Sequence, residues 1–149
     1  MDTGQERLRR MAQRLRETGH RITPQRYAVL RVLAESPRHP SAEQIHGRVK
    51  AEFPMVSLAT VYKTLAVLKE VGEVLELGFP DQGNRYDGRR PLPHPHLVCT
   101  RCREILDPDV DMLAELERHL EARTGYRIVG HRLDFFGLCP RCQADQPSD

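Results

Sequence analysis

The sequence predicts an α+β chain with a helical N-terminal part that ends in a β-hairpin and a C-terminal part of strands and one helix. Three observations support this fold class. Four segments with apolar residues at helical spacing precede residue 72, and two short strand-like segments flank a turn after it. A proline-rich stretch then separates this part from two Cys-x2-Cys pairs. The 149 residues suffice for one ordinary domain or two small ones.

The first two predicted helices have clear ends. Residues 6–17 carry apolar side chains at helical spacing among many arginines, and Gly19 fits a C-terminal stop. Thr23 and Pro24 combine an N-cap hydroxyl with a proline in the first helical turn. The second helix therefore begins there, and we expect it to end before Ser36.

The third and fourth helices are also capped. Residues 41–44 (Ser-Ala-Glu-Gln) form a capping-box pattern, which opens a helix to about residue 50. Ser57 caps the fourth helix, and Gly72 ends it. One face of this helix is apolar. The opposite face carries polar or small side chains: Ala59, Thr60, Tyr62, Lys63 and Ala66.

Two strands are predicted at residues 74–77 and 84–86, around a turn at residues 80–83. Two capped helices separated by a short break and followed by a hairpin are the elements of a winged helix-turn-helix. That motif places its second helix in the major groove of DNA. The sequence therefore predicts an N-terminal winged helix-turn-helix DNA-binding domain.

The composition of residues 87–93 is that of a linker, which predicts domains at residues 1–87 and 94–149 with a hinge at about residues 88–93. In the second domain we expect strands at residues 97–98 and 105–106 and a long strand at residues 126–136. Between them lies a helix whose apolar stripe consists of Val110, Leu113, Leu116 and Leu120. This C-terminal α/β domain has a sheet able to pair across a two-fold axis, and residues 144–149 form a frayed tail.

Charge is spread unevenly along the chain, although the formal net charge is only +2. Residues 1–77 hold 13 Lys and Arg against 9 acidic residues, and residues 78–149 hold 10 against 12. This asymmetry favours an N-terminal half that binds a polyanion and a C-terminal half that binds cations. The alternative is that the excess of arginine belongs to a helix exposed to solvent. No apolar run has the length of a membrane helix, and no secretory signal is evident, so we expect a cytoplasmic protein without a membrane partner.

The four cysteines form two Cys-x2-Cys pairs, which are Cys99, Cys102, Cys139 and Cys142. In a reducing compartment such pairs are metal ligands more often than disulfides. Two pairs complete a tetrahedral shell of thiolates, which is typical of a closed structural zinc site. The alternatives are a thioredoxin-like redox pair or cysteines that are simply buried.

A second cluster combines imidazole and carboxylate groups. His94 and His96 are spaced so that both side chains point the same way on an extended segment. Asp87, Asp107 and His39 are further candidates, and this donor set suits Fe(II) or Mn(II) better than a closed zinc site. Each residue also has an ordinary alternative, because loop aspartates often cap turns and isolated histidines often lie at the surface.

Several motifs, in unbroken order over nearly the whole chain, carry a resemblance to a known family. They are HRITPQR (residues 20–26), HPSA (39–42), SLATVY (57–62), NRYD (84–87), the His-x-His-x2-Cys-x2-Cys run and the final Gly-x-Cys-x2-Cys. With them the chain resembles the ferric uptake regulator family. The resemblance implies a homodimeric, metal-dependent transcription factor that binds double-stranded operator DNA and is usually a repressor.

The resemblance also implies roles for particular residues. Structural Zn2+ would bind Cys99, Cys102, Cys139 and Cys142, and regulatory Fe2+ or Mn2+ would bind His39, Asp87, His94, His96 and Asp107. DNA contact would come from the fourth helix, with Tyr62 and Lys63 at base edges, and from Arg21 in the minor groove. The DNA-contacting set is Arg21, Ser57, Ala59, Thr60, Tyr62 and Lys63.

Two features favour the peroxide-sensing branch of that family over its iron-sensing branch. Iron-sensing members tend to carry Glu where this chain has Asp87 and Asp107. They also often have a further metal site, built from a His and an acidic residue that alternate with the His-x-His pair. This chain has Pro93 and Pro95 at those positions, so His131 is the one residue of that site that it keeps. We therefore expect hydrogen peroxide to oxidise His39 or His94 through bound iron, with an iron-sensing repressor as the alternative.

Two other classes of protein are rivals. The main enzyme alternative is a zinc hydrolase or deaminase. A deaminase would need His-x-Glu and Pro-Cys-x2-Cys, whereas this chain has His94-Pro95-His96, and Leu138 precedes Cys139. The sequence also shows neither a Ser/His/Asp set nor a glycine-rich phosphate loop, so we expect no enzyme activity. The second rival is a zinc-stabilised DNA-binding module that senses nothing.

Overall fold

A computed structural model of the chain describes residues 3–79, 83–91, 94–108 and 112–145. The chain divides into two compact units, Met1–Leu92 and Pro93–Asp149. Four features predicted from the sequence lie wholly or partly outside the described residues: most of the turn at residues 80–83, the end of the hinge at residues 88–93, Val110 of the apolar stripe, and the end of the C-terminal tail.

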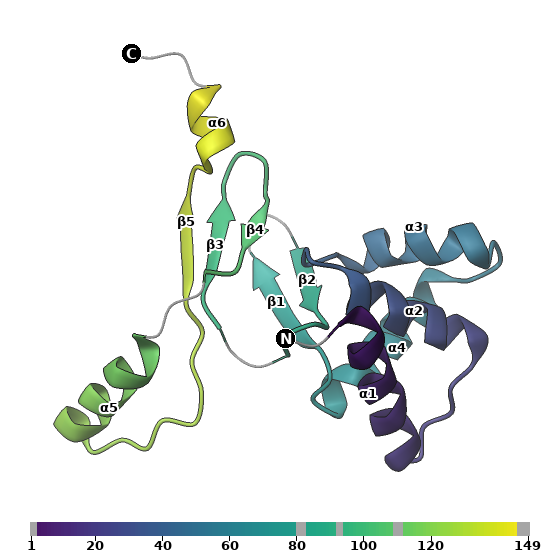
Figure 1. Cartoon of the computed structure of the whole chain (residues 1–149), viewed down its shortest axis with the longest axis horizontal. Helices are drawn as coiled ribbons and strands as arrows, with labels where there is room; N and C mark the ends of the chain where they lie inside the picture. Colours follow the sequence, from purple (N-terminus) through teal and green to yellow (C-terminus); the bar gives the residue numbers. More distant parts are fainter. Residues whose placement is uncertain (1–2, 80–82, 92–93, 109–111, 146–149) are drawn as a thin grey trace. The chain divides into compact units, whose positions relative to one another are not determined.

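The first unit contains four helices and a hairpin (Figure 1). They are α1 (Gly4–Glu17), α2 (Pro24–Glu35), α3 (Ala42–Glu52), α4 (Leu58–Glu70), β1 (Leu75–Phe79) and β2 (Gly83–Asp87). Each helix begins at a hydroxyl residue whose side chain accepts a hydrogen bond from the amide three residues on: Thr3, Thr23, Ser41 and Ser57. These caps satisfy backbone donors that would otherwise lack partners, so the local sequence fixes where each helix starts.

The core of this unit lies between the helices. Its largest fully buried apolar side chains come from all four helices: Met11, Leu15, Val29, Leu30, Leu33, Ile45, Val49, Val61 and Leu68. Burying one such side chain contributes about 1.5–3 kcal/mol. The apolar stripe predicted for α4 is confirmed, because Val61, Leu65 and Leu68 are all buried. The opposite face of α4 is left for solvent or a ligand.

The hairpin is joined to the loop that precedes α3. Strands β1 and β2 pair antiparallel, with Leu75 opposite Asp87 and Glu76 opposite Tyr86. The amide of Tyr86 donates to the carbonyl of Pro40 at 2.9 Å, and Ser41 forms an isolated bridge with Arg85. Strand β2 therefore holds the segment that carries His39.

The second unit contains a small mixed sheet. Its elements are β3 (His96–Cys99), β4 (Ile105–Leu106), α5 (Leu113–Thr124), β5 (Asp134–Gly137) and α6 (Pro140–Ala144). The strand order is β4-β3-β5, with β3 antiparallel to β4 and parallel to β5. Figure 1 shows β3 between the other two strands and α6 directly after β5. The sheet thus brings the two ends of this unit together.

The long strand predicted for residues 126–136 is wrong. Strand β5 covers only residues 134–137, and the preceding segment is extended without a ladder. Strand β3 is four residues long and pairs with β5 from His96 opposite Asp134 to Cys99 opposite Gly137. The amide of His96 also donates to the carbonyl of Leu133 at 3.0 Å, and β3 begins there, so it does not extend alongside residues 126–132. Tyr126 and Val129, which are 76% and 94% exposed, therefore project into solvent.

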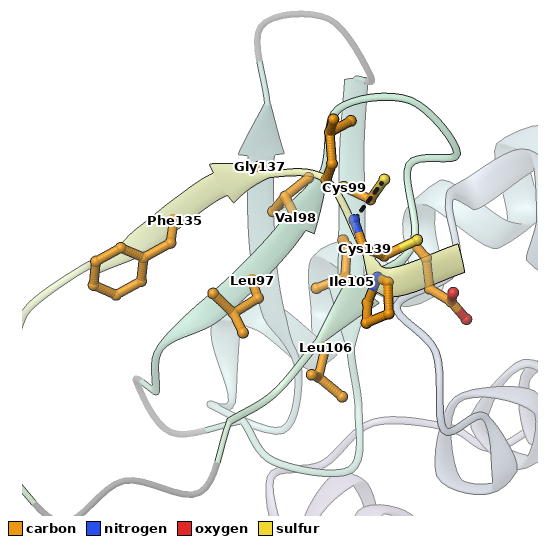
Figure 2. A pocket seen from close by; sticks show the side chains of 11 residues that line it. Leu97, Val98, Cys99, Ile105, Leu106, Phe135, Gly137 and Cys139 are labelled. Atoms are coloured by element: carbon orange, nitrogen blue, oxygen red, sulfur yellow. Dashed lines mark hydrogen bonds between the residues drawn. The ribbon is translucent and has the colours of Figure 1, made fainter. Parts of the chain in front are cut away.

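The apolar stripe of α5 is not covered within this unit. None of the helix's residues is buried among the described part of the chain, and Leu116 and Leu120 are 49% and 43% exposed. On the sheet, Leu97, Ile105, Leu106 and Phe135 line an open hollow of about 380 Å³ next to the cysteines (Figure 2). Among its described residues, this unit therefore exposes more large apolar side chains than it buries. Among the described residues, no helix is long and apolar enough to span a membrane.

Candidate metal centres

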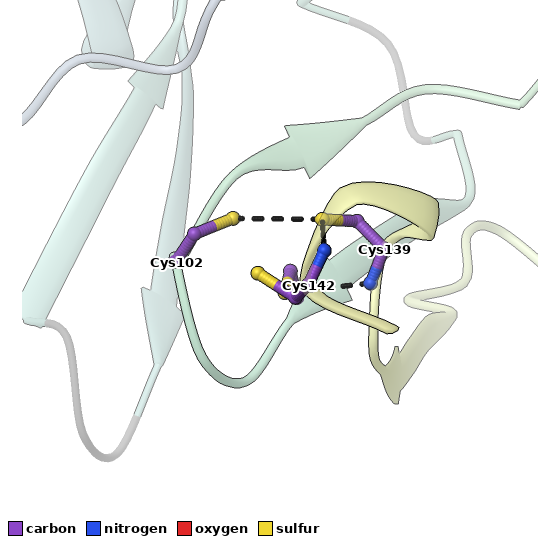
Figure 3. A group of neighbouring side chains, drawn as sticks. Cys102, Cys139 and Cys142 are labelled. Atoms are coloured by element: carbon purple, nitrogen blue, oxygen red, sulfur yellow. Dashed lines mark hydrogen bonds between the residues drawn. The ribbon is translucent and has the colours of Figure 1, made fainter. Parts of the chain in front are cut away.

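The four cysteines of the second unit converge on one point. Cys99 ends β3, Cys102 follows in the turn, and Cys139 and Cys142 belong to the N-terminus of α6. Their four sulfurs lie within 4.8 Å of one another, and the sulfurs of Cys102 and Cys139 are 3.8 Å apart (Figure 3). Tetrahedral Zn–S bonds of about 2.3 Å separate the sulfurs by about 3.8 Å. The quartet therefore fits a zinc ion.

Backbone amides and burial act in opposite directions on these thiols. The amides of Cys139 and Cys102, together with that of Arg101, point at the sulfur of Cys99 and lower its pKa to about 5. Burial raises the pKa of Cys142 to about 12. The amide of Cys142 donates to the sulfur of Cys139, which caps α6. Amides directed at the sulfurs stabilise the thiolate form that a metal requires.

The first unit holds a buried N-terminal pair, which consists of His39 and Asp87. The Nε2 atom of His39 lies 3.2 Å from Oδ2 of Asp87, and the residues are 2% and 6% exposed. His39 comes from the loop before α3, and Asp87 is the last residue of β2. The guanidinium of Arg85 donates to the carbonyl of His39 and so fixes the backbone of this loop.

The carboxylate of Asp87 has two differently used oxygens. Oδ1 accepts hydrogen bonds from the amides of Arg89 and Arg90, each at 2.9 Å. Oδ2 faces His39. The turn after β2 therefore aims one carboxylate oxygen at the imidazole, as is needed where both groups contribute to a cation site.

The second unit holds a C-terminal cluster, which consists of His94, His96 and Asp107. The two rings are 4.4 Å apart between centroids, and both histidines are buried. Nε2 of His94 lies 3.2 Å from Oδ2 of Asp107, and Nε2 of His96 lies 3.7 Å from Oδ1. The structure thus brings together the His-x-His pair and the aspartate that the sequence placed after β4. Imidazole and carboxylate donors suit Fe2+ and Mn2+.

Asp134 belongs to the surroundings of this cluster and was not identified from the sequence. Its Oδ1 lies 3.3 Å from Nδ1 of His96, and its Oδ2 accepts a 2.8 Å hydrogen bond from Arg132. A carboxylate at Nδ1 favours the tautomer that leaves Nε2 available to a metal. The parallel pairing of β3 and β5 sets His96 opposite Asp134. The sequence did not indicate this pairing, because residues 126–136 were predicted as one long strand without a register.

His131 has a local partner instead of a place in either group. Its Nδ1 lies 2.9 Å from a carboxylate oxygen of Glu117 on α5. This contact joins the segment before β5 to the helix. It gives a structural role to a residue whose role the sequence left open.

The candidate DNA-contacting residues of α4 divide into two groups. Ala59, Tyr62 and Lys63 are exposed on one face, and the hydroxyl of Tyr62 donates to Glu43 at 3.1 Å. Ser57 and Thr60 bond to each other and form the helix cap, with 2.9 Å between their hydroxyl oxygens. Arg21 is exposed before α2, and its carbonyl accepts a hydrogen bond from Arg26.

The comparisons with known proteins agree with this arrangement. The model of the ferric uptake regulator family matches residues 17–136 of the chain. The chain belongs to the ferric uptake regulator family. It is 40% identical over 129 residues to the peroxide-responsive repressor PerR of Staphylococcus aureus, covering 87% of this chain and 86% of the relative. The prediction of a repressor of this family that is not an enzyme is thereby confirmed.

Two solved structures extend the comparison. The peroxide stress regulator of Campylobacter jejuni is 32% identical, with a TM-score of 0.68 over 91% of this chain and 98% of that one. The Helicobacter pylori ferric uptake regulator has three functional metal-binding sites and is 23% identical, with a TM-score of 0.82 over 95% of each chain. The predicted fold class, a winged-helix DNA-binding domain followed by an α/β dimerisation domain, is confirmed.

Proposed function

We propose that this protein is a peroxide-responsive, metal-dependent repressor that binds operator DNA as a homodimer. The observation that carries the proposal is the presence of two buried His/Asp groups, one in each unit, beside a separate four-thiol site. A closed thiolate shell suits a permanent zinc ion, whereas imidazole and carboxylate donors suit an exchangeable Fe2+ or Mn2+. The similarity to relatives named for their response to peroxide supports the same subtype.

Zinc in the quartet of Cys99, Cys102, Cys139 and Cys142 would be structural. The cysteines join the end of β3 to α6, so a metal bound there ties the start of the second unit to its end. Four thiolates leave no coordination position for a substrate. Binding of zinc would therefore contribute directly to the folding of this unit.

The regulatory ion would be shared by the N-terminal pair and the C-terminal cluster. His39 and Asp87 would contribute from the DNA-binding domain (residues 1–87), and His94, His96 and Asp107 from the dimerisation domain (residues 94–149). One ion bound to both domains across the hinge at residues 88–93 would fix the angle between them. That angle would set the distance between two recognition helices, which must match half-sites about 34 Å apart.

The response to peroxide would be a loss of ligands. Bound Fe2+ would supply the redox chemistry that lets hydrogen peroxide react at an adjacent imidazole, whereas Mn2+ would not. Overall, one oxygen of hydrogen peroxide is added to the ring of His39 or His94, and the other oxygen leaves as water. An oxidised imidazole binds metal poorly, so the domains would no longer be held at the DNA-binding angle.

DNA contact would come from the exposed face of α4. Tyr62 and Lys63 are exposed and would reach base edges in the major groove, and Ala59 would allow close approach. Ser57 and Thr60 would bind phosphate at the start of the helix, and Arg21 would reach the minor groove. Because many contacts are to phosphates, the affinity should fall steeply with salt concentration.

Repressors of this family bind operator DNA and act as dimers. In this chain the dimer surface would be the exposed apolar side chains of the second unit: Leu97, Leu106, Leu116, Leu120, Phe135 and Phe136. Apolar area of this kind is unfavourable in a monomer and typical of a homodimer interface. Sedimentation of the zinc-loaded protein should show a dimer, and Leu116→Asp should shift it toward monomer.

The decisive experiment combines peptide mass mapping with DNA binding. Protein loaded anaerobically with Fe2+ is given a pulse of hydrogen peroxide, with Mn2+-loaded protein as the control. One added oxygen on His39 or His94 with iron alone, together with loss of DNA binding, supports the proposal. Unmodified histidines and iron-dependent binding that resists peroxide would instead make the protein an iron-responsive repressor. If His39→Ala leaves metal-dependent DNA binding unchanged, the assignment of the regulatory site is wrong.

A further inference from the structure

The side chain of Arg7 on α1 is buried and reaches the backbone next to Asp87. Its Nε donates to the carbonyl of Gly88 at 2.6 Å, and one terminal nitrogen donates to the carbonyl of Glu73 at 2.7 Å. The other terminal nitrogen forms a 2.7 Å ion pair with the carboxylate of Glu73. All three nitrogens of the guanidinium are used, and Arg7 is only 6% exposed. Arg7 therefore joins α1 to the turns before β1 and after β2.

Gly88 is held from a second side as well. A Cβ built on this residue would lie 2.7 Å from Cβ of Leu33 on α2, so the backbone of Gly88 lies directly against a buried side chain. Its carbonyl is bound by Arg7 on α1. The first residue of the predicted hinge is thus fixed between two helices of the first unit.

This fixation orients the carboxylate of Asp87. Gly88 connects Asp87 to the amides of Arg89 and Arg90, which donate to Oδ1. If Gly88 moved, these two amides would move with it, and Oδ1 would lose the bonds that turn Oδ2 toward His39. The contacts of Arg7 therefore act on the same backbone that sets the direction of Oδ2.

We propose that Arg7 is a positioning residue for the regulatory metal site, which it supports by clamping Gly88 and thereby orienting Asp87. The inference rests on the proposed function, since it assumes that Asp87 binds the regulatory ion. A buried arginine is costly to desolvate, and well-packed apolar residues often stabilise a fold equally well, so the buried position of Arg7 is weak evidence for a role in stability alone. The planar fork of the guanidinium is needed, because an ammonium cannot make the same three bonds.

A reciprocal effect follows from thermodynamic linkage. If the clamp helps Asp87 to bind metal, then metal at Asp87 must stabilise the clamp by the same factor. The regulatory ion would thus hold α1 more firmly against the hairpin. The N-terminal helix would respond to metal although it supplies none of the proposed ligands.

The test compares Arg7→Met with Arg9→Met in the full-length, zinc-loaded protein. Arg9 is exposed two residues further along the same helix and is the matched control. Mn2+ affinity is measured by the electron paramagnetic resonance signal of unbound Mn2+. Loss of an outer contact to a metal ligand typically weakens metal binding by about 10–100-fold. We expect about tenfold weaker binding in Arg7→Met and unchanged binding in Arg9→Met.

A second readout needs no Mn2+. Hydrogen exchange at the amides of Arg89 and Arg90 should be at least about tenfold faster in zinc-loaded Arg7→Met without Mn2+ than in wild type under the same conditions, while core amides of α2 keep their protection. Arg7→Lys should not restore either property, because it retains the charge without the fork. Glu73→Gln keeps the bond to Gly88 and should have a smaller effect. It also serves as the milder variant if Arg7→Met folds poorly.

The outcomes separate the inference from the function on which it rests. If the wild-type protein binds no Mn2+ beyond its zinc, or His39→Ala binds it equally well, the proposed metal site fails. If wild type binds Mn2+ through His39 but Arg7→Met and Arg9→Met bind it equally, the clamp is refuted and the proposed function stands. Full rescue by Arg7→Lys would also refute the clamp, since charge alone would then suffice.

Discussion

Replacing Gly88 with alanine should destabilise the first unit through a single steric conflict. The added Cβ would lie 2.7 Å from Cβ of Leu33, whereas ordinary contacts between such atoms begin at about 3.5 Å. The two backbones must therefore separate by most of an ångström. Leu33 is 1% exposed and has no space into which to move. The backbone of Gly88 does not have a positive φ, so the effect is steric and not conformational.

The magnitude follows from two contributions. Overpacking a well-filled core by one methyl group costs about 1–3 kcal/mol. Displacing the carbonyl of Gly88 from Arg7 weakens a buried hydrogen bond to a charged group, which contributes about 1 kcal/mol more. The total is about 2–4 kcal/mol. A unit of this size loses about 4–8 °C in Tm per kcal/mol, so Tm should fall by roughly 10 °C or more.

The assay is thermal and urea unfolding followed by circular dichroism, with Gly47→Ala as the control. Gly47 lies on the exposed side of α3, and a Cβ there would meet no heavy atom within 4 Å. Alanine in place of glycine within a helix stabilises by about 0.5–1 kcal/mol. The two substitutions therefore have opposite predicted signs. A Gly88→Ala protein as stable as wild type would refute the packing argument and weaken the case for the clamp at Arg7.

Three other predictions concern the four-cysteine site, the hairpin and helix α4. Cys139→Ser should lower bound zinc below one ion per chain by elemental analysis and unfold the second unit, because thiolate ligation there contributes folding energy; a folded unit without zinc would contradict this. The pKa of Glu76 is lowered, first by the hydrogen bond from Lys69 and further by those from Asn84 and Tyr86. The ionised carboxylate therefore stabilises the folded state above the pKa that Glu76 has in the unfolded chain, and this stabilisation is lost as the pH falls through its pKa in the folded protein. Glu76→Gln should thus cost about 1 kcal/mol at pH 7, and the difference from wild type should shrink between about pH 5 and pH 3 in urea titrations; a constant difference would argue against the charge. Lys63→Ala should cost about 1–3 kcal/mol on operator DNA and less on unrelated DNA, measured by fluorescence anisotropy; equal losses on both would assign Lys63 to phosphate.

The sequence predicts the first unit better than the second because its signals are local. The hydroxyls of Thr23, Ser41 and Ser57 cap three of the four helices through bonds to residues three positions away, and such patterns are visible without tertiary context. Thr3 caps α1 in the same way, so this helix begins at Gly4 and not at the predicted residue 6. Strand β5 depends instead on the length of β3, which lies about 35 residues earlier. Residues 126–132 have strand-like composition, but β3 begins at His96, which pairs with Asp134 and bonds the carbonyl of Leu133, so it does not extend alongside them.

The same distinction applies to the candidate sites. The cysteines and the His-x-His pair are recognised by spacing, and the structure brings each group together within its unit. Asp134 and Arg7 escaped notice because each acts through a residue far away in sequence, His96 in one case and Gly88 in the other. Every residue has a backbone carbonyl, so the residues around Gly88 do not indicate that an arginine binds there.

Odd- and even-numbered residues of β2 lie on opposite faces of the hairpin and have different partners. Arg85 and Asp87 lie on one face and contact His39, whereas Asn84 and Tyr86 donate to Glu76 on the neighbouring strand. Because side chains alternate along a strand, a shift of one residue in the β1–β2 register would present Tyr86 to His39 and turn Asp87 away. Inserting or deleting residues within β2 in pairs preserves the face of Asp87, whereas single changes do not. The length of the hairpin is thereby constrained by the position of the aspartate at the end of β2.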